Sequence, residues 1–548
     1  MPPILLRFRD AAADWYARST RPQLAVLVAL ALVTIAGGVI RARDVVDRPV
    51  WEDEAYTWKD SQTPLVRLVW WKHDPAHGPA SHLLVRASMA LFGTDAAWAM
   101  RMPSLVCGIL CVPAAFWLGR VIHGNALGLV AAALVAVDPN QVDQSQQARM
   151  YTMLALATML ALAQAVRLLR EPAETRRPWI VLGVTLAAQF WINFGAAALW
   201  LGLAATICGT IVAARRAADE AALERARRIA RGAMVTYGWA VLLAARGLWR
   251  MWIFIKSDRG ISAATLGETL TAIGRGCEQL VGAGPLSALV LIAALVGLAV
   301  LWRQSRAVAV ALTLTAAATL AMIFAGRSVH HMIAVRYFTV LQPAVWLALA
   351  ALVVFARGTA MRGCLAGALL ALVAVQAWQS THIDRWVDVN TWRYARAASR
   401  FIGDARAGGD LVMCTPAVNF GWVARYYDLP GPDDQRLPRE SRDRVAAPAS
   451  GGESATWVMA YMFDPRSEAT LRELVGDARS GQRTAEERDQ IVAAVRDKGL
   501  TVVRLSAGRF DSWVYDAAQD DFVPLETIVA DRPTGVRTAA APDADTPR

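Results

Sequence analysis

The sequence has few charged residues: Asp, Glu, Lys and Arg together make up only 19% of its 548 positions, whereas 55% are hydrophobic. The mean hydropathy is +0.32. Such a composition excludes an ordinary soluble enzyme and indicates a polytopic membrane protein with a soluble part. The formal net charge of +11 therefore indicates orientation across a membrane, since Lys and Arg are retained on the cytoplasmic side, rather than nucleic-acid binding.

Cysteine is also scarce, and the six cysteines lie mostly inside apolar runs with neither paired nor metal-type spacing. We therefore expect no disulfide framework and no zinc site. In the stretch "KHDPAHGP" (72–79), His73, Asp74 and His77 have ligand-like spacing, but two loop histidines beside prolines bind no metal more often than they bind zinc. A small-residue cleavage site is missing near the N-terminus, so residues 24–40 are expected to be a retained first span.

Long apolar runs are abundant instead. Eleven of them are long enough, or nearly so, to cross a hydrocarbon core of about 30 Å. The shorter run 80–92 contains His82 and Arg86, so we expect it to form a helix at the membrane interface. The eleven expected spans are residues 24–40, 103–120, 126–139, 151–169, 178–192, 196–214, 233–249, 285–302, 307–325, 338–356 and 363–379.

The arginines predict how these spans are oriented. Four arginines precede the first span and place the N-terminus inside. With strict alternation, the arginine-rich connections after the fourth, sixth, eighth and tenth spans also fall inside, whereas counting 80–92 as a span would move them outside. The expected outer face therefore contains residues 41–102, 140–150, 250–284, 326–337 and everything after 380.

Three of these outer segments carry the polar groups that stand out. In "WEDEAYTW" (51–58), three adjacent acids repel one another and gain nothing from a membrane, so they are either a solvated loop or are held there for chemistry. The segments "DPNQVDQSQQARMYTML" (138–154) and "GRSVHHMIAVRYFTVLQP" (326–343) combine arginine with tyrosine. Arginine forks for phosphate and a carboxylate for a proton are what an anionic, lipid-anchored substrate needs.

Short motifs in and near these segments match the sequence pattern of one family. Through these motifs the chain resembles the GT-C superfamily of polyprenyl-phosphate-sugar-dependent glycosyltransferases, specifically the protein O-mannosyltransferases and bacterial lipid A aminoarabinose transferases. The resemblance covers residues 24–170 and continues more thinly to residue 430, including a helix expected at 390–402. The motifs are Asp53-Glu54-Ala55-Tyr56, His77-Gly78-Pro79, Arg101-Met102-Pro103-Ser104, Gln147-Ala148-Arg149-Met150-Tyr151 and Arg336-Tyr337.

The resemblance implies a role for each matched side chain. It implies catalytic roles for Asp53 and Glu54, with Asp53 as the base, and no cofactor besides the lipid-linked sugar donor. Gln147 stands where relatives often carry an acid, which leaves open whether the chain has a second catalytic carboxylate. Asp143 is close by in the sequence. Gly78-Pro79 also departs from the family's proline pair. The donor phosphate is expected to contact Arg149, Tyr151, Arg336 and Tyr337, and the substrate to contact Tyr56, His77 and Arg101.

The C-terminal part differs in composition from residues 1–380, which form the expected transmembrane domain. Residues 381–530 alternate short apolar stretches, "DLVMC", "ATWVMAYM" and "LTVVRLS", with helical segments such as "TAEERDQIVAAVRDKG", in which Thr484 and Glu487 form a capping box. We predict a small α/β domain outside the membrane, followed by a disordered tail at 531–548. The fold class is thus mostly α, a polytopic GT-C fold with a small outer α/β domain.

The expected function is transfer of a sugar, in a single inverting displacement, from a polyprenyl-phosphate carrier to a lipid, glycan or protein acceptor at the outer face of the bacterial inner membrane. Nucleic acid is not an expected partner. One alternative is a lipid-linked glycan transporter or flippase, which would need charged residues inside several spans, whereas the charges here crowd the outer loops. Another is a membrane-anchored binding protein, which would leave the motif matches unexplained.

Overall fold

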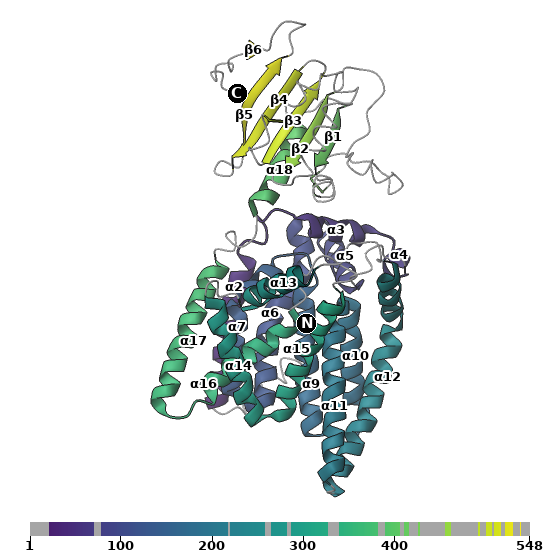
Figure 1. Ribbon diagram of the computed structural model, residues 1–548, viewed down its shortest axis with the longest axis vertical. Helices are drawn as coiled ribbons and strands as arrows, with labels where there is room; N and C mark the ends of the chain where they lie inside the picture. The colour runs from purple at the N-terminus through teal and green to yellow at the C-terminus, as the bar shows by residue number, and fades with distance from the viewer. Residues whose placement is uncertain are drawn as a thin grey trace, which may run out of the picture. The chain divides into compact units, whose positions relative to one another are not determined.

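A computed structural model gives the fold (Figure 1). It divides into two compact units. The transmembrane unit comprises residues 1–46 and 60–383, and the sheet unit comprises residues 47–59 and 384–548. The structure describes residues 21–70, 78–217, 220–257, 265–281, 286–326, 339–381, 389–405, 410–415, 423, 426–427, 455–461, 492–493, 500–506, 509–516, 521–529 and 537–538.

Seven described helices are long and apolar enough to cross a membrane, which indicates a multi-pass membrane protein. On α2 and α17, large apolar side chains such as Leu32, Ile35 and Leu370 are exposed, as expected of surfaces that face lipid. The seven helices are α2 (Arg21–Ala42), α6 (Ala97–His123), α9 (Tyr151–Arg170), α11 (Ala197–Ala217), α14 (Ser287–Gln304), α15 (Arg306–Gly326) and α17 (Thr359–Ser380).

The other four expected spans also coincide with helices. Three of these are shorter, namely α7 (Asn125–Val137), α10 (Arg177–Ile192) and α16 (Gln342–Val354). The fourth expected span, 233–249, lies within the 38-residue helix α12 (Glu220–Ser257). The mostly helical, polytopic fold is therefore confirmed, although α12 already begins in a segment that the sequence indicated as a basic connection.

The first outer segment is largely helical as well. It contains α3 (Glu52–Gln62), α4 (Leu65–Trp70) and the 13-residue helix α5 (Ala80–Phe92). The expected short helix at 80–92 is therefore present. The remaining helices of the transmembrane unit are α8 (Pro139–Ser145), the 3-10 helix η1 (Phe194–Ala196) and α13 (Leu266–Val281).

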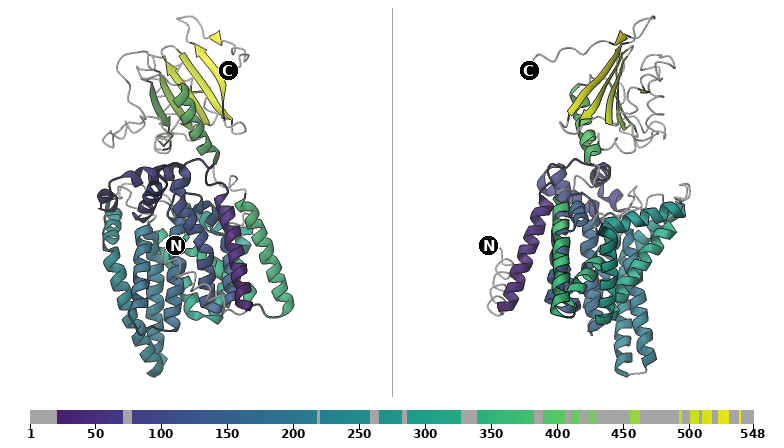
Figure 2. Two further views of the ribbon diagram at one scale, coloured as in Figure 1. Left: turned by 180° about the vertical axis from the view of Figure 1, so that it is seen from behind. Right: turned by 60° about the vertical axis from the view of Figure 1, so that its left-hand side comes forward.

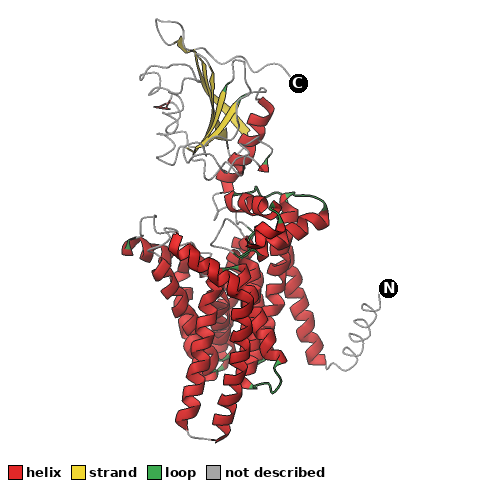
Figure 3. Ribbon diagram, turned by 90° about the vertical axis from the view of Figure 1, so that its right-hand side faces the viewer, coloured by secondary structure: helices red, strands yellow, loops and turns green. Residues whose placement is uncertain are grey.

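The sheet unit contains a single described sheet with strand order β1-β2-β3-β4-β5-β6, in which β1 and β2 are parallel and all other neighbours are antiparallel. Among the described residues, strands occur only in this unit (Figure 3). The elements are α18 (Val389–Ala405), β1 (Leu411–Thr415), β2 (Thr456–Tyr461), β3 (Leu500–Ser506), β4 (Arg509–Asp516), β5 (Asp521–Val529) and β6 (Arg537–Thr538).

Helix α18 lies against one face of the sheet (Figure 2), and aromatic side chains make the contact. Phe401 lies 5.2 Å from the ring of Trp513 and 5.0 Å from that of Phe522, while Trp457 stacks on Trp513 at 5.7 Å. The buried Tyr394 donates its hydroxyl hydrogen to the carbonyl of Thr501. This aromatic core explains how a sheet unit with few long apolar runs buries enough surface to fold.

The expected helix at 390–402 and the three expected strands are all present. Strands β4 and β5 were not expected, because "RFDSWVYD" and "DFVPLETIV" mix polar and apolar residues without a clear alternation. The helix expected around "TAEERDQIVAAVRDKG" lies outside the described residues except at 492–493. Of the tail 531–548, the structure describes only β6.

Candidate functional site

The three adjacent acids form the first turn of α3 rather than a solvated loop. Trp51 precedes the helix, and its carbonyl accepts from the main-chain N–H of Glu54 at 3.0 Å. The Glu54 carboxylate in turn accepts from the Trp51 N–H at 3.4 Å. The bond from the Trp51 N–H to the Glu54 carboxylate corresponds to one half of a capping box, and the helix dipole favours negative charge in the first turn. The helix N-terminus therefore accommodates three carboxylates that would otherwise repel one another.

The three acids have different environments. Glu54 is fully buried, whereas Glu52 and Asp53 are half-buried. The main chain at Asp53 is held by Thr57, whose hydroxyl donates to the Asp53 carbonyl at 2.8 Å. Tyr56, a predicted substrate contact, is half-buried on the same helix. Glu54 thus stabilises the start of the helix, and Asp53 remains the candidate base, with its carboxylate on a fixed helical turn.

Tyrosines of the sheet unit support this end of α3. The Tyr427 hydroxyl accepts from the N–H of Val50 at 2.9 Å, and the ring of Trp58 contacts Tyr426 edge-on at 5.6 Å. Residues 426–427 and 47–59 belong to the same compact unit. No local sequence pattern indicates this contact, because Val50 and Tyr427 are 377 residues apart.

The other end of α3 is held by α5. His82 is buried, and its Nε2 lies 3.8 Å from a carboxylate oxygen of Asp60. Arg86 donates to the carbonyls of Ser61 at 3.3 Å and Thr63 at 2.6 Å. The two polar residues that argued against a membrane span at 80–92 therefore anchor the C-terminal end of the acidic helix.

Gly78, where the chain departs from the family's proline pair, lies against α10. A Cβ atom at this position would lie 1.8 Å from the carbonyl oxygen of Trp191 and 2.2 Å from its carbonyl carbon. Real side chains never approach main-chain atoms so closely, so only glycine fits there. The departure therefore has a local steric cause.

A second group of predicted residues comes together at the turn between α8 and α9. Arg149 is only 4% exposed, and its guanidinium carbon lies 5.9 Å from the centroid of the Tyr151 ring. Tyr151 begins α9 and is 2% exposed. Its buried hydroxyl has no hydrogen-bond partner among the described residues. A buried phenol that bonds to nothing in the described part of the chain is a position where a ligand oxygen would be favoured.

The motif beginning at Arg101 supports this turn. Ser104 donates its hydroxyl to the Arg149 carbonyl at 2.6 Å, and Thr152 donates to the Ser104 carbonyl at 2.9 Å. Two motifs that are more than 40 residues apart in the sequence are thereby brought into contact. Arg101 itself is fully buried on α6 and donates to the carbonyl of Val45 at 2.8 Å.

Gln147 stands where relatives often carry an acid, and the structure pairs it with one. Its amide donates to a carboxylate oxygen of Asp143, one turn earlier on α8, at 2.7 Å. Asp143 is half-buried. His77, Arg336 and Tyr337 lie outside the described residues. Within the described part of the chain, no group of three or more His, Cys, Asp or Glu residues is placed to hold a metal ion.

Arg41, which the sequence did not single out, organises the helices beneath this turn. It is fully buried and donates to the carbonyls of Ala136 and Val135, both at 2.7 Å, at the end of α7. Its Nε donates to the hydroxyl of Ser145 on α8 at 3.2 Å. A Cβ on Gly108 of α6 would lie 2.0 Å from that hydroxyl oxygen. Arg41 therefore joins α2, α7 and α8, with α6 packed closely against them.

A buried polar network also ties α8 to the start of α16. Asp138 accepts from the Gln141 N–H at 2.8 Å, which caps α8, and from the Trp346 indole at 3.0 Å. Gln141 donates to the side chain of Gln342, and Gln144 donates to Thr339 at 3.3 Å. The α8 segment that leads to Arg149 is thus fixed from two sides.

Part of the chain matches a known protein family. Residues 76–220 match the dolichyl-phosphate-mannose-protein mannosyltransferase family. This segment contains α5, the motif at Arg101 and the Arg149–Tyr151 turn. No curated protein sequence matches the chain.

Several solved structures are similar at low sequence identity. ArnT from Cupriavidus metallidurans, bound to undecaprenyl phosphate, is 13% identical with a TM-score of 0.51, over 82% of this chain and 94% of that chain. The Archaeoglobus fulgidus oligosaccharyltransferase is 15% identical with a TM-score of 0.47 over 75% of this chain, which spans 58% of its length. The S. cerevisiae Pmt1-Pmt2 complex is 17% identical with a TM-score of 0.33, over 47% of this chain and 37% of that chain. The resemblance found in the sequence is confirmed, since the chain has the GT-C fold and residues 76–220 match the dolichyl-phosphate-mannose-protein mannosyltransferase family.

Proposed function

We propose that the chain is an inverting glycosyltransferase that moves a sugar from a polyprenyl-phosphate carrier to a lipid, glycan or protein acceptor. The observation that carries the proposal is the buried Arg149 beside Tyr151, whose hydroxyl has no partner among the described residues. A guanidinium and a phenol together offer the charge-assisted donors that a phosphate monoester needs. The similar ArnT structure, which contains undecaprenyl phosphate, supports this class of donor.

In the proposed reaction, the acceptor hydroxyl attacks the anomeric carbon of the sugar, and the bond from that carbon to the phosphate oxygen breaks. Asp53 accepts the hydroxyl proton as attack proceeds, and Arg149 stabilises the charge that develops on the departing polyprenyl phosphate. Base catalysis of this kind is worth about 10² to 10⁴ in rate, and alignment of the two bound substrates contributes further. No metal ion is assigned, because arginine can neutralise a single phosphodiester.

The proposed location is the outer face of a bacterial inner membrane, with the N-terminus inside. It is supported by the arginine distribution in the sequence and by the seven membrane-crossing helices. Charged residues within spans do not add support for a transporter. Arg41 bonds to main-chain carbonyls, while Arg246 donates to the carbonyl of Val69 at 3.0 Å and lies over the ring of Trp70 at 4.4 Å.

Binding of the lipid donor tests the proposal. We predict that Arg149→Gln weakens binding of polyprenyl phosphate by about 1.5 to 3 kcal/mol, or roughly ten- to a hundredfold in Kd, because it removes a charged hydrogen-bond donor. Tyr151→Phe removes a neutral donor and is expected to cost about 0.5 to 1.5 kcal/mol. The measurement is a titration of the purified protein with polyprenyl phosphate, followed by native mass spectrometry.

The matched control is Arg167→Gln, which removes an exposed arginine at the opposite end of α9. Its affinity for polyprenyl phosphate should equal that of the wild type. If the Arg149 and Tyr151 variants also bound the lipid with wild-type affinity, these side chains would have only a structural role and the donor site would lie elsewhere.

A further inference from the structure

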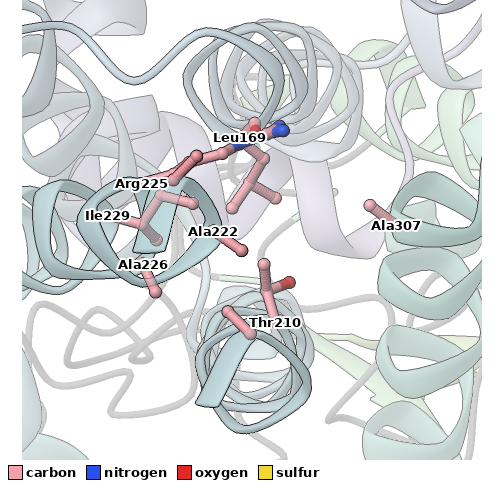
Figure 4. Close-up of a pocket in the computed structure, with 9 residues that line it drawn as sticks. Leu169, Thr210, Ala222, Arg225, Ala226, Ile229 and Ala307 are labelled. Atoms are coloured by element: carbon pink, nitrogen blue, oxygen red, sulfur yellow. The ribbon is translucent and has the colours of Figure 1, made fainter. Parts of the chain in front are cut away.

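A cavity of about 430 Å³ lies at the end of the transmembrane unit that is remote from Tyr151. Four helices surround it (Figure 4). Its lining includes Leu169 at the end of α9, Thr210 and Ala214 on α11, Ala222 and Ile229 on α12, and Ala307 at the start of α15. At this end α11 and α12 run side by side and project past the neighbouring helices (Figure 1).

The wall of the cavity is mostly apolar, with Thr210 and Arg225 as its polar side chains. The hydroxyl of Thr210 donates to the carbonyl of Thr206 at 2.8 Å, so it is already satisfied. Most of the other lining side chains are alanines, whose small size leaves the space between the helices open. The volume lies within the range of about 300 to 1,000 Å³ that ligand sites occupy. Such a wall suits a hydrocarbon chain rather than a polar solute.

The surroundings of the cavity are cationic. Arg225 lines it and donates to the carbonyls of Leu169 at 2.6 Å and Arg170 at 2.9 Å, which caps the end of α9. Arg215 directly follows Ala214, and Arg306 directly precedes Ala307. Both are exposed, and neither forms an ion pair with a described acidic side chain.

Two of the acids at this end are engaged in ion pairs. Glu224 lies 3.6 Å from Arg227 and 3.2 Å from Arg231, and Glu174 lies 3.7 Å from Arg228. These two acids are therefore paired with arginines of α12 rather than with Arg215 or Arg306, while the exposed Glu171 and Glu220 are outnumbered by the arginines at this end. The cavity thus combines an apolar interior with positive charge at the ends of membrane-crossing helices.

We propose that this cavity binds one anionic membrane phospholipid, with an acyl chain against the alanine-lined wall and the headgroup phosphate near Arg215 and Arg306. Lipid headgroups lie near the depth where α9 ends and α15 begins, and anionic headgroups attract clustered arginines there. A free phosphate would leave the apolar wall without a partner. In the orientation proposed from the arginine distribution, the lipid comes from the cytoplasmic leaflet. The site is independent of the donor site at Arg149.

The test compares two lipids with the same acyl chains, anionic phosphatidylglycerol and zwitterionic phosphatidylcholine, in titrations of the purified full-length protein followed by native mass spectrometry. We expect phosphatidylglycerol to bind the wild type at least about tenfold more tightly, as a charged headgroup at an arginine cluster should. The double variant Arg215→Gln/Arg306→Gln should lose this preference. Ala222→Phe should weaken binding of both lipids because its ring fills the cavity.

The matched control is Arg177→Gln, an exposed arginine at the same end that does not adjoin the cavity. It should keep the wild-type preference, and polyprenyl phosphate binding should be unchanged in all of these variants. A photoactivatable acyl chain on phosphatidylglycerol should label peptides from α11 or α12. Equal binding of the two lipids by the wild type, full displacement of the lipid by inorganic phosphate, or unchanged binding in Ala222→Phe would each overturn the proposal.

Discussion

Asp53→Asn is expected to reduce sugar transfer by about 10²- to 10⁴-fold, the usual contribution of a general base, while the protein still inserts and folds. Asn preserves the size of the side chain and most of its hydrogen bonding, but it cannot accept a proton at neutral pH. The half-buried carboxylate lies on the first turn of α3, where Thr57 holds the main chain, so the substitution should leave the helix intact. The measurement is the rate of sugar transfer by isolated membranes that contain each variant.

The two neighbouring acids provide matched controls. Glu52→Gln should be nearly neutral. Glu54→Gln should mainly lower stability, by about 0.3 to 1 kcal/mol, because it keeps an acceptor for the Trp51 N–H but removes a negative charge that the helix dipole favours in the first turn. An active Asp53→Asn enzyme together with an inactive Glu54→Gln enzyme would mean that the family motif is aligned one residue out of register. Activity in all three variants would leave the acids with a purely structural role at the helix N-terminus.

Arg41→Met is expected to cause the largest loss of stability, about 2 to 5 kcal/mol, because each buried carbonyl left without a donor costs about 1 to 3 kcal/mol. Met has a similar length but donates nothing, so the carbonyls of Val135 and Ala136 lose their partner inside a packed helix junction. The turn that carries Arg149 should also loosen, because Arg41 bonds to Ser145 on α8. The measurement is the unfolding temperature of the detergent-purified protein.

Arg43→Met is the matched control, since Arg43 is exposed and its contacts with described residues are long, at 3.4 Å to the Thr381 carbonyl and 3.9 Å to Asp44. Exposed contacts of this kind contribute about 0 to 1 kcal/mol. Equal unfolding temperatures for the two variants would show that the Arg41 hydrogen bonds do not hold α2, α7 and α8 together.

Much of the transmembrane fold was predictable because a bilayer imposes a length and a composition on every helix that crosses it. Each of the eleven apolar runs coincides over most of its described residues with a helix, and the short length and polar residues of 80–92 indicated that α5 does not cross. The beginning of α12 at Glu220 was not predictable from hydropathy, since arginine-rich segments form helices as readily as loops. Strands β4 and β5 were missed because their stability comes from aromatic contacts with α18 and neighbouring strands, not from a regular pattern.

The residues of the candidate site were predictable where they belong to a short sequence motif. The residues that hold them in place were not predictable, because they are distant in the sequence. Asp53 and the Arg149–Tyr151 turn follow from motifs. The role of Arg41 was not predictable from the sequence, where it is simply an arginine at the end of the first apolar run. Its partners are main-chain carbonyls some 95 residues away. The Asp138–Trp346 bond joins positions 208 residues apart. No local sequence pattern predicts such pairs, since any main-chain carbonyl could accept the arginine's hydrogen bonds and any indole could donate to the carboxylate.

Lipid analysis of cells tests the proposed transfer most directly. Mass spectrometry would compare polyprenyl-phosphate sugars and envelope glycans, lipids and proteins in cells that carry the wild-type chain or Asp53→Asn. The proposed function predicts that one polyprenyl-phosphate-linked sugar accumulates in the variant cells and that the same sugar disappears from one class of envelope molecule. Identical lipid and envelope sugar inventories in the two strains would contradict it.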